Sequence, residues 1–165
     1  MDAKYFPIEI EEKWSKVWAE RELNKPESEQ NFSQIIPPPN VTGTLHMGHS
    51  FQYAIMDFYT RYHHMNGLDS YWQVGTDHAG IATQMVVENN LTNEGKDKND
   101  LGREKFLEEV WKWKDYSEEK ITSQIKRLGS TVEWDKYRFT FDDDFCDSVN
   151  KAFVELYRNE KIYRG

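Results

Sequence analysis

The stretch PPPNVTGTLHMGH, residues 37–49, decides how this chain folds and what it can bind. A short apolar run at 32–36 precedes it, and a segment with helical spacing of apolar residues follows from 45 to about 65. Three successive prolines cannot continue a strand or a helix, so the stretch is predicted to be a turn between the two. Such a turn brings the imidazoles of His46 and His49 to a helix N-terminus, where unpaired N–H groups and the helix dipole favour an anion. We interpret it as a binding site for the phosphates of ATP.

A second strand is predicted at 70–74, followed by the turn GTDHAG at 75–80 and a helix over 81–91. Strand, helix and strand of these lengths form a βαβ unit, so the strands are expected to be parallel. Both loops then follow the carboxyl ends of their strands, where open α/β sheets bind ligands. We expect the loops to face one cleft in which Asp77 meets a cationic group such as an ammonium. The sequence is equally consistent with Asp77 as the N-cap of the helix that starts at Ile81.

The rest of the chain alternates helices with short extended segments. Further helices are predicted at 8–23, at 103–128 and after the acidic run 142–144, with an extended segment at 131–141. A polar linker at 24–31 and a charged loop at 92–101 separate these elements. The residues expected to face a core are Ile10, Trp14, Val17 and Trp18 in the first helix, Phe106, Val110, Trp113, Ile121, Ile125 and Leu128 in the long helix, and Phe145, Val149, Phe153 and Leu156 in the last.

The composition indicates a folded protein with an acidic surface. Of the 165 residues, 38% are hydrophobic and 15% aromatic, which is ample for a core and excludes disorder of the whole chain. The net charge of −8 repels a polyanion, so any contact with RNA needs a local patch or further sequence. Cys146 is the only cysteine, which excludes an internal disulfide. No apolar run approaches the roughly 20 residues that span a bilayer, and the N-terminus lacks a signal or transit composition, so we expect a cytoplasmic protein.

The chemically active residue types also allow other interpretations. His46 and His49 by themselves fit two structural histidines, whereas a metal-binding helix usually adds a carboxylate or a third ligand close by. The acidic run 142–144 is more typical of a helix start than of a magnesium site. His63 and His64 are assigned to the surface. Cys146 is expected to be a small apolar side chain on the inward face of the last helix.

The quoted stretch resembles the first signature, the HIGH-type motif, of the class I aminoacyl-tRNA synthetases. Its PPPNVTG lead-in, the GTDHAGIATQ sequence at 75–84 and the tail with VEWD at 132–135 are similar to the valyl family within that class. The resemblance covers essentially the whole chain. It implies an α/β fold, the first half of a Rossmann-type parallel-sheet nucleotide-binding domain, truncated before the editing insertion. Residues 1–31 would be an N-terminal helix and linker, and residues 32–165 the N-terminal half of the catalytic domain.

The resemblance also implies an activity, in which valine is activated by ATP with Mg²⁺ and transferred to tRNA(Val). The valine carboxylate would attack the α-phosphorus, giving valyl-adenylate and pyrophosphate, and the valyl group would pass to the 2′-hydroxyl of the terminal ribose. The implied roles are ATP-phosphate contacts and catalysis for His46 and His49, nucleotide binding for Gly43, Thr44 and Gly48, the aminoacyl pocket for Pro38 and Asn40, and the valine ammonium for Asp77. Gly48 is expected to leave room for a flat base or ribose.

Several parts of the family's machinery are missing from these residues. A second signature of the Lys-Met-Ser-Lys-Ser type, an editing site and an anticodon-binding domain are all lacking, so the chain alone is expected to be inactive, with most tRNA contacts elsewhere. An uncovered sheet edge and apolar helix faces would favour self-association. The alternative function is a non-catalytic nucleotide-binding module, and a weaker one is a His-x-x-His metallohydrolase.

Overall fold

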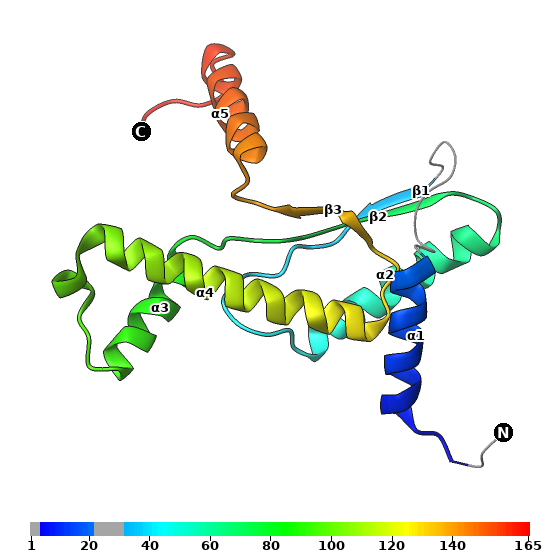
Figure 1. Cartoon of the computed structure of the whole chain (residues 1–165). Helices are drawn as coiled ribbons and strands as arrows, with labels where there is room; N and C mark the ends of the chain where they lie inside the picture. The colour runs from blue at the N-terminus through cyan, green and yellow to red at the C-terminus, as the bar shows by residue number, and fades with distance from the viewer. Residues whose placement is uncertain (1–3, 22–31) are drawn as a thin grey trace.

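The computed structural model describes residues 4–21 and 32–165, so the linker predicted at 24–31 lies outside the described residues. Figure 1 shows the order of the elements along the chain. They are α1 (Pro7–Arg21), β1 (Phe32–Ile35), α2 (Met47–Met65), β2 (Ser70–Thr76), α3 (Ile81–Asn93), α4 (Lys98–Leu128), β3 (Glu133–Phe139) and α5 (Asp143–Arg158). No helix in this described part of the chain is long and apolar enough to cross a membrane.

The strands form one sheet in the order β1-β2-β3, and both pairings are parallel. The predicted parallel βαβ unit and α/β fold are therefore confirmed. Strand β2 lies in the middle, and its pairing with β3 shifts register between Gln73 and Gly75. A Cβ added at Gly75 would lie 2.3 Å from the carbonyl oxygen of Arg138, so the close approach of these two strands requires glycine.

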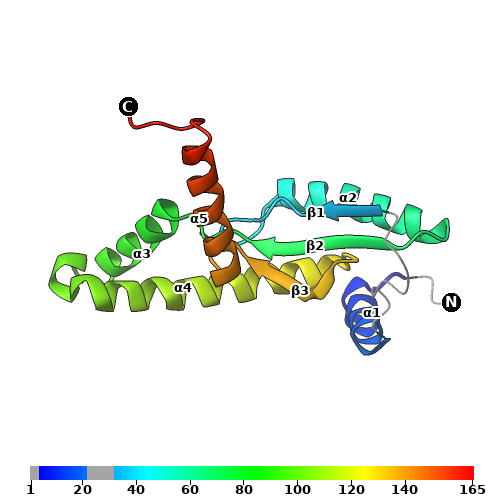
Figure 2. The ribbon, with the colours of Figure 1, turned by 90° about the horizontal axis from the view of Figure 1, so that it is seen from above.

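Helices α2 and α4 cover the same face of the sheet (Figures 1 and 2). Tyr53 of α2 is fully buried against Trp72 of β2, with the ring centroids 6.4 Å apart in an edge-to-face arrangement. Helix α4 contributes Ile121 and Ile125, both almost completely buried. The core cluster comprises Ile36, Val41, Tyr53, Trp72, Val74, Ile121, Ile125, Val132 and Phe139. Val41 belongs to the quoted stretch, so the loop after β1 is anchored in the core.

Glycines lie at the ends of the two helices that pack on the sheet. Gly67 follows α2 with φ of 77°, and Gly129 ends α4 with φ of 73°, a conformation that costs glycine little. The charged loop predicted at 92–101 is shorter than expected, because α3 continues to Asn93 and α4 starts at Lys98. A non-helical residue, Gly102, then interrupts α4 just before the predicted helix start.

The predicted inward face of α5 is wrong. The described residues bury no side chain of this helix, and Phe145, Val149, Phe153 and Leu156 are 40–66% exposed. Figure 1 shows α5 projecting away from the sheet after β3. Leu128, Trp14 and Ile10 are also exposed, and Cys146 is only half-buried. Amphipathic spacing identifies which face of a helix is apolar, but it does not state whether a partner covers that face.

Candidate functional site

The loop after β1 and the loop after β2 meet at the carboxyl edge of the sheet. Asn40 and Asp77 form an isolated parallel bridge beyond the ends of the two strands. The Asp77 amide donates to the Pro39 carbonyl at 2.9 Å, and the Val41 amide donates to the Asp77 carbonyl at 2.9 Å. Residues almost 40 positions apart in sequence are thus held side by side. The predicted convergence of the two loops is confirmed for their backbones.

Helix α4 holds the first loop by three hydrogen bonds to alternate residues. The Trp113 indole N–H donates to the Val41 carbonyl at 3.0 Å, and the Ser117 hydroxyl donates to the Gly43 carbonyl at 2.9 Å. The Leu45 amide donates to the side-chain oxygen of Gln124 at 2.9 Å. These three α4 residues were missed as site residues, and the only signal in the sequence was a polar Ser117 on an otherwise apolar helix face.

A cavity of about 460 Å³ opens along this loop. Six of the predicted site residues line it, namely Pro38, Asn40, Gly43, Thr44, His46 and His49. The remaining lining residues are Pro37, Pro39, Thr42, Leu45, Gln52 and Ile121. The other two predicted residues, Gly48 and Asp77, do not line the cavity. The backbone of Asp77 is bridged to that of Asn40, which does line it.

His46 and His49 cap the start of α2 with their own side chains. His46 is the N-cap, and its Nδ1 accepts the Gly48 amide at 3.1 Å. His49 reaches back, and its Nδ1 accepts the His46 amide at 3.3 Å. This is a capping box made of two imidazoles, with ring centroids 4.0 Å apart.

The cap assigns the protons of both rings. A nitrogen that accepts an amide N–H carries no proton, so each neutral imidazole is protonated at Nε2. Burial, and secondarily the neighbouring His46, lowers the pKa of His49, which favours its neutral form. The first turn of α2 contains no acidic residue. The helix start therefore offers two N–H donors and a positive dipole end to an anion.

Gly48 is closely approached by the His46 ring. A Cβ at this position would lie 2.8 Å from Cε1 and 3.0 Å from Nδ1 of His46. The His46 ring therefore occupies the space that a side chain at position 48 would need. Glycine at this position lets the imidazole fold over the helix start and cap it.

Asp77 is not the N-cap of α3. Gly80 occupies that position, with φ of 44° and no side-chain capping bond. The Asp77 carboxylate instead accepts the Thr140 hydroxyl at 2.8 Å and the Ala79 amide at 3.2 Å. Thr140 follows β3, so three consecutive strand ends contribute to this corner. The sequence assigns Thr140 no role in the site, because nothing local to it signals a partner 63 residues away.

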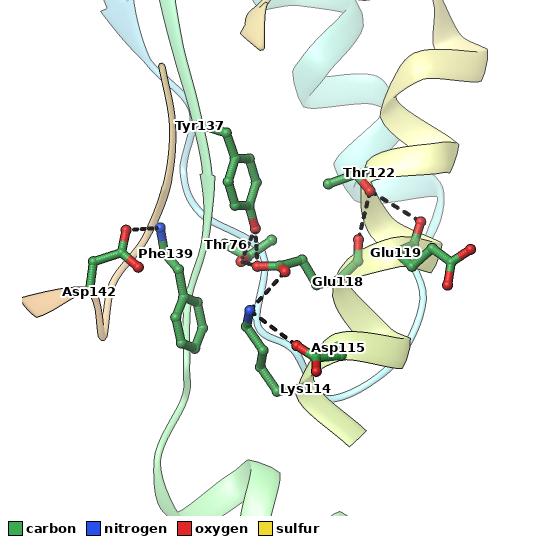
Figure 3. Close-up of polar contacts among 9 residues, drawn as sticks. All are labelled: Thr76, Lys114, Asp115, Glu118, Glu119, Thr122, Tyr137, Phe139 and Asp142. Atoms are coloured by element: carbon green, nitrogen blue, oxygen red, sulfur yellow. Dashed lines mark hydrogen bonds and ion pairs between the residues drawn. The ribbon is translucent and has the colours of Figure 1, made fainter. Parts of the chain in front are cut away.

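A polar network fixes the end of β2 just before Asp77 (Figure 3). The Tyr137 hydroxyl donates to Glu118 at 2.5 Å and contacts the buried Thr76 hydroxyl. Lys114 pairs with the other Glu118 oxygen at 2.8 Å. Burial, and then the bond to Glu118, raises the pKa of Tyr137 well above its ordinary value, so the phenol stays protonated. The network joins α4 to both β2 and β3.

The described residues contain no group of three or more His, Cys, Asp or Glu side chains placed to hold a metal ion. The acidic run opens α5 as predicted, with Asp142 at the N-cap and Asp143 and Asp144 in the first turn.

His64 is exposed, as expected, whereas His63 is half-buried and stacks on Phe32 with ring centroids 4.0 Å apart.

Comparison with known proteins connects this geometry to a family. The model of tRNA synthetases class I (I, L, M and V) matches residues 9–165. The valine–tRNA ligase of Acinetobacter baylyi is 52% identical over 162 residues, which are 98% of this chain but 17% of that protein. A LeuRS from Agrobacterium radiobacter, solved in a ternary complex with tRNA and LeuAMS, superimposes with a TM-score of 0.75 over 98% of this chain and 19% of its own, at 22% identity. At this level of identity, the structural similarity shows a shared fold alone.

Proposed function

The chain belongs to the class I tRNA synthetases, and from this membership we propose that the whole protein is a valine–tRNA ligase. It would activate valine with ATP, forming valyl-adenylate and releasing pyrophosphate, and then charge tRNA(Val). The 52% identity to a valine–tRNA ligase supports valine over the other amino acids of the family. This chain would supply the part of the site that faces the triphosphate and the amino-acid ammonium.

The observation that carries the proposal is the imidazole capping box at the mouth of the cavity. Its Nδ1 atoms are occupied by backbone amides, so both Nε2–H groups remain for a ligand. Two neutral donors at a helix N-terminus suit phosphate oxygens, and the cavity of about 460 Å³ has the size of a small-molecule site. ATP supplies the activated α-phosphorus and the pyrophosphate leaving group.

Each part of the site would then do a separate task. His46 and His49 would donate hydrogen bonds to phosphate oxygens and stabilise the charge that grows in the transition state. The loop held by α4 would keep these donors in place before ATP arrives, which limits reorganisation during the reaction. Asp77 would bind the valine ammonium, with Pro38 and Asn40 beside the side chain. We propose that Mg²⁺ enters bound to the ATP phosphates.

Two further assignments belong to the same proposal. The net charge of −8 opposes a polyanion, so most tRNA contacts would come from regions outside this chain. A single cysteine suits a reducing compartment, and we propose the cytoplasm as the location.

The test is valine-dependent pyrophosphate exchange by the full-length protein. His46→Ser keeps a good N-cap but removes the imidazole donor, and His49→Ala removes the second donor. Each is expected to lower exchange by roughly 10²-fold or more, the scale of one lost transition-state donor. Circular dichroism checks that the helices persist. Unchanged exchange in both variants would refute the role of the pair, and absence of valine-dependent exchange in the unaltered protein would refute the proposed activity.

A further inference from the structure

All the hydrogen bonds of the Asp77 carboxylate converge on one of its oxygens. Oδ1 accepts the Thr140 hydroxyl at 2.8 Å and the Ala79 amide at 3.2 Å, and it lies 3.3 Å from Nδ1 of His78. Oδ2 has no hydrogen-bond partner in the part of the chain that the structure describes. The side chain is 35% exposed, so a ligand can reach the carboxylate.

The three contacts of the Thr140 hydroxyl determine the direction of its proton. A hydroxyl has one proton to donate and two lone pairs to accept. The His78 amide can only donate, and it reaches Thr140 Oγ1 at 2.9 Å. Asp77 as a carboxylate can only accept, so the Thr140 proton goes to Oδ1. The remaining lone pair accepts Nδ1–H of His78 at 2.7 Å, which makes this imidazole protonated at Nδ1.

The position of Thr140 is itself fixed by the sheet. Its amide donates to the Thr76 carbonyl at 3.1 Å, which continues the pairing of β2 and β3 by one residue. The His78 ring contacts the rings of Phe139 and Phe141, with centroids 6.4 and 5.1 Å away. The Thr140 hydroxyl is thus held by the sheet, and the His78 imidazole is held by two phenyl rings. A ligand can bind without moving either support.

We propose that Thr140 is a positioning residue for amino-acid recognition. By holding Oδ1, it sets the rotation of the Asp77 carboxylate and leaves Oδ2 free to accept the α-ammonium of the substrate. The inference rests on the proposed function and extends it to a residue on the third strand. A carboxylate with one oxygen already bonded loses less conformational freedom when it binds a cation, so the contact with the substrate gains affinity.

The experiment compares four forms of the full-length protein with the unaltered one, namely Thr140→Val, Thr140→Ser, Asp77→Asn and the double variant Thr140→Val with Asp77→Asn. Pyrophosphate exchange is measured over a range of valine and of ATP. Thr140→Val keeps the shape and removes the hydroxyl, so KM for valine should rise by about tenfold, the scale of one hydrogen bond to a charged group. KM for ATP and kcat should stay within about twofold. Thr140→Ser keeps the hydroxyl and should behave as the unaltered protein.

The double variant separates positioning from a general structural effect. If Thr140 acts through Asp77, its replacement should change KM for valine by less than about twofold once Asp77 is asparagine. Equal effects of Thr140→Val in both backgrounds, or an equal rise in KM for valine and for ATP, would overturn the inference. If Thr140→Val does not fold, Thr140→Ala is measured in its place and interpreted in the same way.

The outcome also separates this inference from the function on which it rests. Impaired use of valine in Asp77→Asn, with normal use in Thr140→Val, would overturn the positioning role and leave the ammonium site intact. Normal use of valine in Asp77→Asn would instead refute the ammonium site.

Discussion

The hydroxyl of Ser117 offers a direct test of how the loop after β1 is held. Ser117 is 1% exposed, and its hydroxyl donates to the Gly43 carbonyl at 2.9 Å. Ser117→Ala removes this donor, and alanine has a higher helix propensity than serine. A carbonyl left without its partner costs about 1–3 kcal/mol, and this cost falls on the closed form of the loop. Local opening should therefore become roughly 5- to 150-fold more frequent.

Hydrogen exchange of the loop amides measures this opening. The amides of Val41 and Leu45 are bonded to Asp77 and Gln124, so both exchange only when the loop separates from its supports. Ser123→Ala is the matched control on the same helix. Ser123 is exposed, and its hydroxyl bonds only to the Lys120 carbonyl one turn earlier. Exchange at Val41 and Leu45 should increase in Ser117→Ala and stay unchanged in Ser123→Ala. The same exchange rates in both variants would refute the reasoning that α4 side chains hold the loop.

Two further predictions concern the titration of His49 and the packing of Gly75. Because burial and His46 lower the pKa of His49, its NMR titration midpoint should lie below the ordinary 6.5 and move part of the way back in His46→Ser. A lowered pKa means that the folded state prefers the neutral His49 ring. The contribution of this ring to the free energy of unfolding is therefore complete above pH 6.5, and it is lost as the pH falls through the lowered pKa. A midpoint at or above 6.5 would contradict the assignment. Gly75→Ala places a Cβ 2.3 Å from the Arg138 carbonyl oxygen, so unfolding by urea should show a loss of about 3 kcal/mol or more. Gly43→Ala is the control, because its Cβ meets no atom within 4 Å, and it should change the free energy of unfolding by less than about 1 kcal/mol. Equal losses in the two variants would show that the contact with the Arg138 carbonyl does not matter.

Much of the fold follows from local signals in the sequence. Proline runs and glycines mark where strands and helices end, and two loops after parallel strands must reach the same edge of a sheet. The bridge between Asn40 and Asp77 is the structural consequence of that rule. Local periodicity carries no information about partners, however. The apolar face of α5 has the spacing of a buried face, yet Phe153 is 62% exposed.

The chemistry of the site was predictable by residue type but not by hydrogen bonding. The sequence marks His46 and His49 as neighbours on a helix, and it cannot show that both Nδ1 atoms accept backbone amides. It marks Asp77 as a free carboxylate or a helix cap, and the true partner, Thr140, comes from the third strand. Such long-range partners depend on the register of β2 with β3, which is set by packing over the whole sheet.

His46 and His49 carry their proton on Nε2, whereas His78 carries its proton on Nδ1. This difference matches the charges proposed for the ligand. His46 and His49 accept the backbone at Nδ1 and keep Nε2–H as a donor, beside a helix start without acidic residues. His78 uses Nδ1–H for Thr140, so its proton supports the hydroxyl that restrains Asp77. The start of α2 therefore presents N–H donors, which would suit the negative phosphates of ATP. The loop after β2 presents a carboxylate oxygen, which would suit a positive ammonium. In the proposed function, a ligand with the reverse order of charges would meet an acceptor where it needs a donor. The hydrogen bonds within the protein would therefore favour one orientation of the amino acid and the nucleotide.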